Sequence, residues 1–272
     1  MPSLAAPGFD LDLTLRSGQF FRFRPDGDGF LLVDSGRVLR LRPQGDRIEY
    51  RGGTAAHVRR LLGLDADHGA ALAALRRDPL LAAVLPRYAG MRIMTQDPWV
   101  CLVSFVCSSM SNMKRIQGNV EGIARAFGPA LEDGIHDFPG PAALPAGALA
   151  PIRLGWRERF VAGLFARVDP ARLHALAARP FEEARAALME LPGVGPKVAE
   201  CVMAFSLGFG EACPVDVWIR RVGRRLWFRN RRVPDRRIAD RFRATFGRHA
   251  ALAQQIWFQA VRDGVPVGQA PR

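Results

Sequence analysis

Hydrophobic and polar positions alternate in short runs along the first fifty residues. The runs are Leu11-Leu13-Leu15, Phe21-Phe23, Phe30 to Val33, Val38 to Leu41 and Ile48 to Tyr50. Between them lie glycine-containing turns such as Asp26-Gly27-Asp28-Gly29 and Asp34-Ser35-Gly36. A period of two with this punctuation predicts strands, and such short turns join antiparallel neighbours. We therefore expect an antiparallel meander.

The rest of the chain has the spacing of helices. Helical patterns run from Thr54 to about Arg87, so residues 1–93 are expected to form a small unit of antiparallel sheet and helices. After Met94 the pattern is almost wholly helical, beginning with an N-cap and a first-turn proline at Asp97-Pro98 and stopping at Gly128. Further helices are expected at 155–168, 170–178, 180–190, 194–207, 217–228, 235–246 and 249–262. The predicted fold is α+β, with an all-α unit over residues 94–272.

Charge changes this picture by suggesting a polyanionic partner. The net charge is +13, and the segment from Arg220 to Arg248 holds twelve arginines against Asp235 and Asp240. Arginines that neutralise phosphates release condensed counterions on binding, so nucleic acid is favoured over a merely solvated basic face.

Cysteine usage and hydropathy narrow the class further. The four cysteines, Cys101, Cys107, Cys201 and Cys213, form no CxxC pair, so we expect neither disulfides nor a metal site. No run approaches the roughly 18 apolar residues of a membrane span, and the first ten residues lack signal-peptide features. We expect a cytoplasmic, nucleoid-associated monomer with no membrane contact.

The most informative segment joins two helical patterns and reads Leu191-Pro192-Gly193-Val194-Gly195-Pro196-Lys197-Val198-Ala199. Two glycines let the backbone approach a ligand closely, and the N–H groups at a helix start attract an anion. We expect a phosphate-binding hairpin over about residues 188–208, with DNA contacts from Gly193, Val194 and Gly195. A glycine turn of this kind can also be a plain connection.

The wider sequence removes much of that ambiguity. From Leu191 to Pro214-Val215-Asp216 the chain resembles the helix-hairpin-helix, Gly/Pro-Asp superfamily of base-excision glycosylases. Blocks in family order also resemble the 8-oxoguanine DNA glycosylases: Ser17-Gly18-Gln19-x-Phe21-Arg22, Phe105-Val106-Cys107-Ser108-Ser109, Leu154-Gly155-Trp156-Arg157 and Ala253-Gln254-x-x-x-Phe258. The four-cysteine iron–sulfur loop of related branches is missing, so no cofactor is expected.

Lys197 stands where the resemblance places the nucleophile of strand-cleaving members. A phosphate contact is the simpler role, but arginine would serve for that. Only Lys114 and Lys197 are lysines among 39 basic residues, so a lysine here favours amine chemistry. A neutral amine can attack the sugar C1′ and form a Schiff base, which arginine cannot do.

Two neighbours complete the expected reaction centre. Asp216 is a natural N-cap for the following helix, and the resemblance also gives it the role of stabilising positive charge on the sugar. Cys201 stands one helical turn after Lys197. It fits an ordinary core position, whereas the resemblance implies that it lines the base pocket.

Lesion recognition is assigned by the resemblance to three positions. The Gly18 carbonyl would accept the extra N7–H of an 8-oxopurine, Gln254 would bind its Watson–Crick edge, and Phe258 would stack on the base. Without the resemblance, Gln254 would be a solvated helix glutamine.

Four residues are expected at the orphaned base. Trp156 would fill the gap left by the extruded base, and Arg115 and Arg157 would face the base opposite, although both could be phosphate contacts. Met110 replaces the asparagine that animal and fungal relatives carry after the serine pair. If Met110 faces DNA rather than the core, one polar contact to cytosine is lost and opposite-base preference relaxes.

The expected function is that of a bifunctional glycosylase and AP lyase, which excises 8-oxoguanine, and formamidopyrimidine as a second substrate, from double-stranded DNA containing oxidised purines. Two alternatives remain: a monofunctional alkylpurine glycosylase, which uses water and an aspartate, and a non-catalytic helix-hairpin-helix DNA-binding module.

Overall fold

A five-stranded antiparallel sheet forms the N-terminal layer of the computed structural model, which describes residues 1–132 and 134–268. The strands are β1 (Ser3–Ala5), β2 (Phe23–Asp26), β3 (Gly29–Asp34), β4 (Arg37–Gln44) and β5 (Arg47–Arg51), in the order β1-β5-β4-β3-β2. The predicted meander is confirmed for β2 to β5, which pair with their chain neighbours. The sequence pattern did not reveal β1, which pairs Leu4 with Ile48.

One predicted strand is wrong, because Leu11 to Leu15 lies in helix α1 (Leu11–Arg16). The buried positions are Leu11, Thr14 and Leu15, spaced three and four apart as on one helix face. Asp10 caps the helix by accepting a hydrogen bond from the Leu13 N–H at 2.8 Å. The Asp10 cap and the burial of Thr14 therefore favour a helix over the strand that the alternating leucines predicted.

Thirteen α-helices, four short 3-10 helices and two sheets make up the regular structure of the described residues. Beyond α1 the α-helices are α2 (Ala55–Leu61), α3 (His68–Leu75), α4 (Pro79–Tyr88), α5 (Pro98–Cys107), α6 (Met113–Phe127), α7 (Glu158–Arg167), α8 (Pro170–Ala175), α9 (Phe181–Met189), α10 (Pro196–Phe205), α11 (Val217–Trp227), α12 (Asp235–Phe246) and α13 (Ala250–Arg262). A small hairpin of β6 (Ala130–Glu132) and β7 (Ile135–His136) follows α6. The predicted helix start is confirmed at α5, where the Asp97 carboxylate accepts from the Val100 N–H at 2.9 Å.

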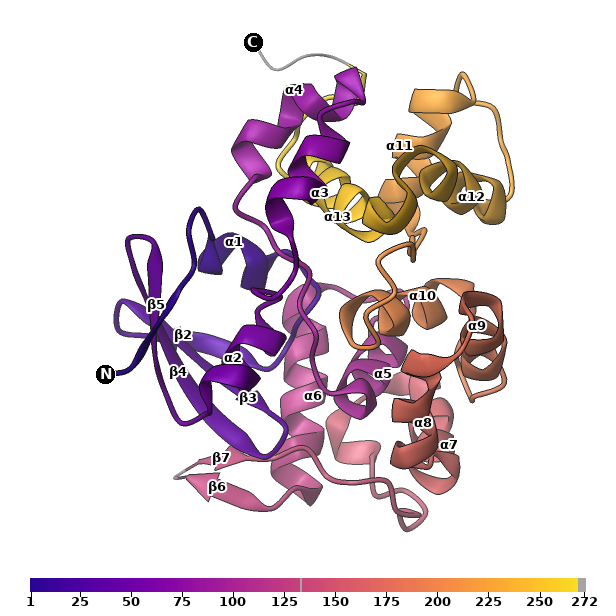
Figure 1. Cartoon of the computed structure of the whole chain (residues 1–272). Coiled ribbons are helices and arrows are strands. Elements are labelled where there is room, and N and C mark those ends of the chain that lie inside the picture. The colour runs from indigo at the N-terminus through magenta and orange to yellow at the C-terminus, as the bar shows by residue number, and fades with distance from the viewer. Residues whose placement is uncertain (133, 269–272) are drawn as a thin grey trace.

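Most of the helices divide into two packed groups, one above the other in Figure 1. Helices α5 to α10 share one core, in which α5 is buried along its whole length. Helices α3 and α4 precede them in sequence but pack with α11, α12 and α13 in the upper part of the molecule. The sheet has its own core with α1 and α2. A domain boundary at residue 93 stays a prediction.

No helix within residues 1–132 and 134–268 is both long enough and apolar enough to cross a bilayer.

Candidate active site and DNA interface

The hairpin between α9 and α10 is closed by a glycine in a conformation that other residues rarely adopt. Gly193 has φ +76°, and the next residue, Val194, donates its N–H to the Leu191 carbonyl at 3.1 Å. A Cβ atom on Gly193 would lie 2.7 Å from Cβ of Phe160 in α7. At Gly195 no atom lies within 4 Å of such a Cβ, so the start of α10 opens toward free space. The first N–H groups of α10 can therefore meet a phosphate there.

Lys197 lies in the first turn of α10, and its amine faces the C-terminal end of α5. The Lys197 Nζ donates a hydrogen bond to Ser108 Oγ at 3.0 Å and lies 4.9 Å from the centroid of the Phe105 ring. Phe105 lies in the buried helix α5 and Ser108 directly follows it, so the amine is held against the end of a buried helix rather than free in solvent.

Asp216 caps α11 with only one of its two carboxylate oxygens. Its Oδ1 accepts from the N–H groups of Trp218 at 2.9 Å and Ile219 at 2.8 Å. Burial raises the pKa of Asp216 above its ordinary value, while the nearby charge of Lys197 acts in the opposite direction. The cap and a second role are thus compatible, because Oδ2 has no protein donor within the described residues.

Cys201 is buried one turn along α10 from Lys197. It is 2% exposed, and burial raises the pKa of its thiol to about 12 although the charge of Lys197 lowers it. The group is therefore a neutral thiol at physiological pH. It belongs to the same core as Phe105 and Phe205.

Glu200 fixes the loop that leads from α10 to Asp216. This buried carboxylate accepts from the Cys213 N–H at 2.7 Å, from Arg243 Nη1 at 3.0 Å and from Arg185 Nε at 3.1 Å. Burial raises the pKa of Glu200, and the charges of the two arginines lower it. One side chain thus ties together α9, α10, α12 and the loop before Asp216.

Residues from opposite ends of the chain meet at the expected base pocket. Gly18 has φ +89°, and a Cβ there would lie 3.0 Å from Cε of Met113 and 3.5 Å from the Phe258 ring. Gln254 is 3% exposed, and its Oε1 has no hydrogen-bond partner. The alternative of a solvated helix glutamine is therefore wrong. An unpaired buried carbonyl is costly, so it is a natural acceptor for a bound base.

Met110 projects from the loop between α5 and α6. It is 90% exposed and has φ +49°, a left-handed conformation that is uncommon for residues other than glycine and asparagine. The alternative of a core residue is therefore wrong. Its backbone is held by Arg157, whose Nη2 donates to the Met110 carbonyl at 2.8 Å and whose Nε donates to the Ser109 carbonyl at 2.7 Å.

Arg157 has a structural task that the sequence did not indicate. Its side chain is buried and also donates to the Leu154 carbonyl at 3.2 Å, so most of its donors are used within the protein. Trp156 beside it is 49% exposed, with its ring 4.8 Å from the Arg157 guanidinium carbon and edge-on to Phe160 at 5.9 Å. Arg115 is exposed and donates to the Arg153 carbonyl at 3.3 Å. Base reading by Arg115 and Arg157 stays a prediction.

Comparison with known proteins shows which proteins the chain resembles. A family model described as the N-terminal domain of 8-oxoguanine DNA glycosylase matches residues 3–102. The structure resembles that of MBOgg1 bound to a low-affinity DNA ligand, with TM-score 0.91 and 29% identity over 97% of this chain and 96% of that one. Over nearly its whole length, the chain is thus similar to an Ogg1 protein, and its first hundred residues match a model of the 8-oxoguanine DNA glycosylases.

Two further proteins show the same similarity. The Clostridium acetobutylicum 8-oxoguanine glycosylase/lyase, in complex with double-stranded DNA containing cytosine opposite 8-oxoguanine, has TM-score 0.88 and 25% identity over 95% of this chain and 93% of that one. The N-glycosylase/DNA lyase OGG1 of Arabidopsis thaliana is 32% identical over 209 residues, which are 68% of this chain and 56% of the relative. The match therefore spans little more than half of the plant protein.

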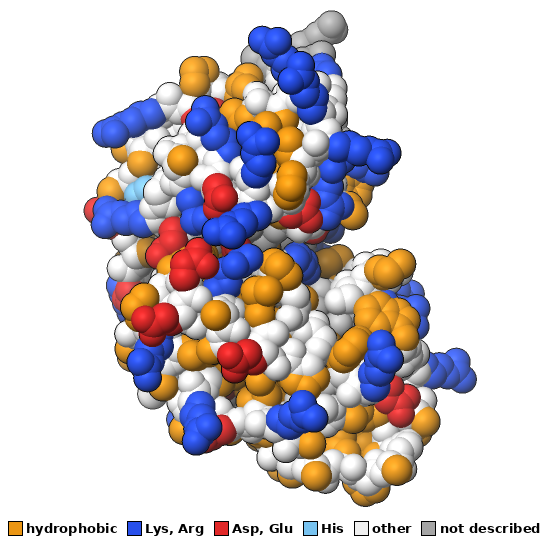
Figure 2. All heavy atoms as spheres, turned by 90° about the vertical axis from the view of Figure 1, so that its right-hand side faces the viewer, with side chains coloured by type: hydrophobic (Ala, Val, Ile, Leu, Met, Phe, Trp, Pro, Cys, Tyr) orange, Lys and Arg blue, Asp and Glu red, His pale blue; other side chains and the backbone are white. Residues whose placement is uncertain are grey.

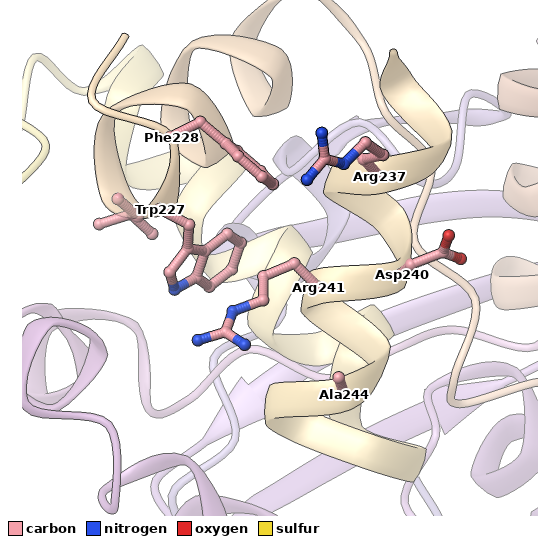
Figure 3. A pocket seen from close by; sticks show the side chains of 7 residues that line it. Trp227, Phe228, Arg237, Asp240, Arg241 and Ala244 are labelled. Atoms are coloured by element: carbon pink, nitrogen blue, oxygen red, sulfur yellow. The ribbon is translucent and has the colours of Figure 1, made fainter. Parts of the chain in front are cut away.

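The surface of the chain is unevenly charged. Lysine and arginine side chains gather over the upper part of the face in Figure 2, which includes α11 and α12. A groove of about 630 Å³ lies there, lined by Leu226, Trp227, Phe228, Arg237, Asp240, Arg241 and Ala244 (Figure 3). The Arg237 guanidinium lies 5.4 Å from the Phe228 ring, and Arg241 lies 5.9 Å from Trp227. None of the expected base-pocket residues lines this groove.

Sequence reasoning missed three residues of the site. Met113 lies against Gly18, Ser108 accepts a hydrogen bond from the Lys197 amine, and Glu200 anchors the loop before Asp216. Ser108 stood within a motif that carried the family resemblance, but nothing in its spacing pointed to Lys197. Glu200 was detectable only as a charged residue at an otherwise apolar stretch of helix.

Proposed function

We propose that the protein is a bifunctional DNA glycosylase and AP lyase that excises 8-oxoguanine, with formamidopyrimidine as a second substrate, from duplex DNA. The observation that carries the proposal is the placement of the Lys197 amine at the start of the hairpin helix, bonded to Ser108 and close enough to Asp216 to affect its pKa. A DNA-binding module without catalysis has no need for a lysine there, because arginine binds phosphate at least as well.

Recognition follows from the pocket's unpaired acceptors. An extruded 8-oxopurine would donate its N7–H to the Gly18 carbonyl and its Watson–Crick N–H groups to Gln254 Oε1, while the Phe258 ring stacks on it. Guanine lacks the N7–H, so the Gly18 carbonyl would be covered by the base and gain no donor. Leaving one buried acceptor unpaired costs about 1–3 kcal/mol, which favours the lesion over guanine.

The chemistry follows from a neutral Lys197 amine. Its nitrogen forms a bond to C1′ as the bond from C1′ to N9 of the base breaks, and the departing base takes up a proton. The sugar ring then opens to a Schiff base, loses a proton from C2′ and expels the 3′ phosphate. Asp216 Oδ2 offers negative charge to the sugar as the first bond breaks. No redox or metal cofactor enters these steps.

Within the duplex, Trp156 would occupy the gap left by the extruded base. Met110 would face the orphaned base on the opposite strand. A thioether donates no hydrogen bond, so we infer a relaxed preference for the opposite base. The protein would act as a monomer on double-stranded DNA. Its placement in the cytoplasm, at the nucleoid, stays a prediction.

Substitution of the nucleophile tests the proposal. Lys197→Arg keeps the charge but removes the nucleophilic amine, so lesion-DNA binding should persist while base release and borohydride trapping are both lost. Lys114→Arg is the matched control, since Lys114 is the other lysine of the chain and is exposed. It should trap like the wild type. Undiminished trapping by Lys197→Arg would overturn the mechanism, and base release without any trapping in the wild type would favour the monofunctional alternative.

A further inference from the structure

The Lys197 amine has a hydrogen-bond partner, Ser108, that can do more than stabilise its charge. Ser108 directly follows α5, and its hydroxyl makes two hydrogen bonds of opposite sense. It donates to the Phe105 carbonyl at 2.7 Å and accepts from Lys197 Nζ at 3.0 Å. The single hydroxyl proton is thus committed to the backbone, and only oxygen lone pairs remain to face the amine.

This arrangement restricts what Ser108 can do to a neutral amine. A neutral lysine has two N–H groups and one lone pair, and attack on C1′ requires that lone pair to be free. Because the proton of Ser108 is already bonded to Phe105, the hydroxyl can accept an N–H but cannot donate to the lone pair. The Phe105 ring, 4.9 Å from Nζ, covers a second side and also has no polar hydrogen to offer.

We propose that Ser108 is a positioning residue for the nucleophile, which binds one N–H of Lys197 and thereby turns the lone pair toward the sugar. This inference rests on the proposed lyase function and adds to it a residue that acts through Lys197 rather than on DNA. The Phe105 carbonyl contributes by accepting the hydroxyl proton of Ser108, which fixes the direction of that proton.

The effect should appear in the chemical step and not in binding. A misplaced reacting group can lower a rate by about 100-fold, so we expect Ser108→Ala to slow imine formation about 10- to 100-fold at saturating DNA. The dissociation constant for a duplex with an unreactive abasic-site analogue should change less than about threefold. Ser108→Thr should restore most of the rate, because a threonine hydroxyl can bond the same preceding carbonyl and still accept from Lys197.

A second serine provides the structural control. Ser206 ends α10 and donates to the Val202 carbonyl at 2.6 Å, so it makes the same kind of helix-end bond as Ser108. Ser206→Ala should therefore lose comparable stability and keep the wild-type rate of imine formation.

The experiment is single-turnover borohydride trapping on an abasic-site duplex, which removes base recognition from the measurement. Failure of the wild type to trap would refute the proposed function itself. A wild type that traps, with Ser108→Ala equally fast or merely weaker in binding, would refute only the role of Ser108. If Ser108→Ala does not fold, Ser108→Cys and Ser108→Thr decide the matter, since a thiol is a much weaker acceptor than a hydroxyl. Equal rates for these two variants would also overturn the inference.

Discussion

One carboxylate oxygen of Asp216 caps α11, and the proposed mechanism uses the other. Asparagine is a comparable N-cap through its side-chain oxygen, but it carries no negative charge. We therefore expect Asp216→Asn to melt within a few degrees of the wild type and to excise the base much more slowly in single-turnover assays. A sharply lower melting temperature with an unchanged rate for the folded fraction would mean that Asp216 serves only as a cap.

The raised pKa of Asp216 also gives that substitution a pH signature. Burial favours the neutral carboxylic acid, so the required carboxylate is lost as the pH falls through a value above the ordinary aspartate pKa of about 3.9. Excision by the wild type should decline on the acid side at a correspondingly higher pH. This decline should be absent from the residual activity of Asp216→Asn.

Met110 is the residue at which selectivity for the opposite base should change. Asparagine adopts the left-handed conformation more readily than methionine and offers both a donor and an acceptor to cytosine. One good base contact is worth about 1–3 kcal/mol, so Met110→Asn should raise the preference for cytosine about ten- to a hundredfold. The measurement is single-turnover excision of 8-oxoguanine opposite C, T, G and A. A strong cytosine preference in the wild type, unaltered by the substitution, would contradict this role.

Among the elements, α10 depends on Glu200 for its placement against three neighbouring segments. Removing this carboxylate would leave the Cys213 N–H without its acceptor and would leave Arg185 and Arg243 with only the more exposed carboxylates of Glu182 and Asp240. Breaking a buried ion pair costs about 3–5 kcal/mol. Glu200→Ala should therefore lower the free energy of unfolding by about that amount, measured by urea titration. Glu182 is a matched control, since it pairs with the same Arg185 at 3.7 Å but is 70% exposed. Glu182→Ala should cost less than about 1 kcal/mol.

The elements also mark how far periodicity alone could predict the fold. The strands from β2 to β5 and the cap of α5 follow from local patterns, because hairpin turns and N-caps are decided by residues a few positions apart. Helix α1 and strand β1 do not: α1 carries alternating leucines, and β1 exists through pairing with β5 more than forty residues away. The residues near β1 in sequence therefore do not predict its pairing with β5.

The residues of the expected base pocket could also not all be predicted from local sequence. Gly18, Met113 and Phe258 meet only after the two ends of the chain have packed together. The resemblance supplied Gly18 and Phe258, whereas Met113 has no sequence signal of its own. The buried state of Gln254 and the exposure of Met110 likewise required the packed structure, since both residues fit a helix pattern in either orientation.

The whole molecule is built from helical groups that do not follow chain order. Helix α4 buries Leu81, Val84 and Leu85 against the C-terminal helices, and Tyr88 donates to Asp263 at 2.9 Å. At about 1.5–3 kcal/mol for each aliphatic side chain, the three contribute about 5–9 kcal/mol, comparable with the whole stability of many proteins. A fragment of residues 94–272 should therefore lack a cooperative thermal transition, whereas residues 67–272 should retain one.

Differential scanning calorimetry of the two fragments tests whether residues 94–272 need α3 and α4 or fold as an autonomous unit. Equal melting temperatures for both would place the boundary at residue 93 and make α3 and α4 dispensable.

The contact between Gly193 and Phe160 has a consequence for how such a protein would travel along DNA. The hairpin turn lies directly on Phe160, and Trp156 lies edge-on against the same ring, so the proposed phosphate contact and the proposed wedge share one supporting side chain. On the proposed roles, Trp156 would stay close to the base stack while the hairpin holds a phosphate. Each step of a sliding search would then press Trp156 against the base stack, and every base pair passed would be tested for its resistance to opening. A weakly stacked lesion would be detected mechanically, before any of its atoms reached the pocket.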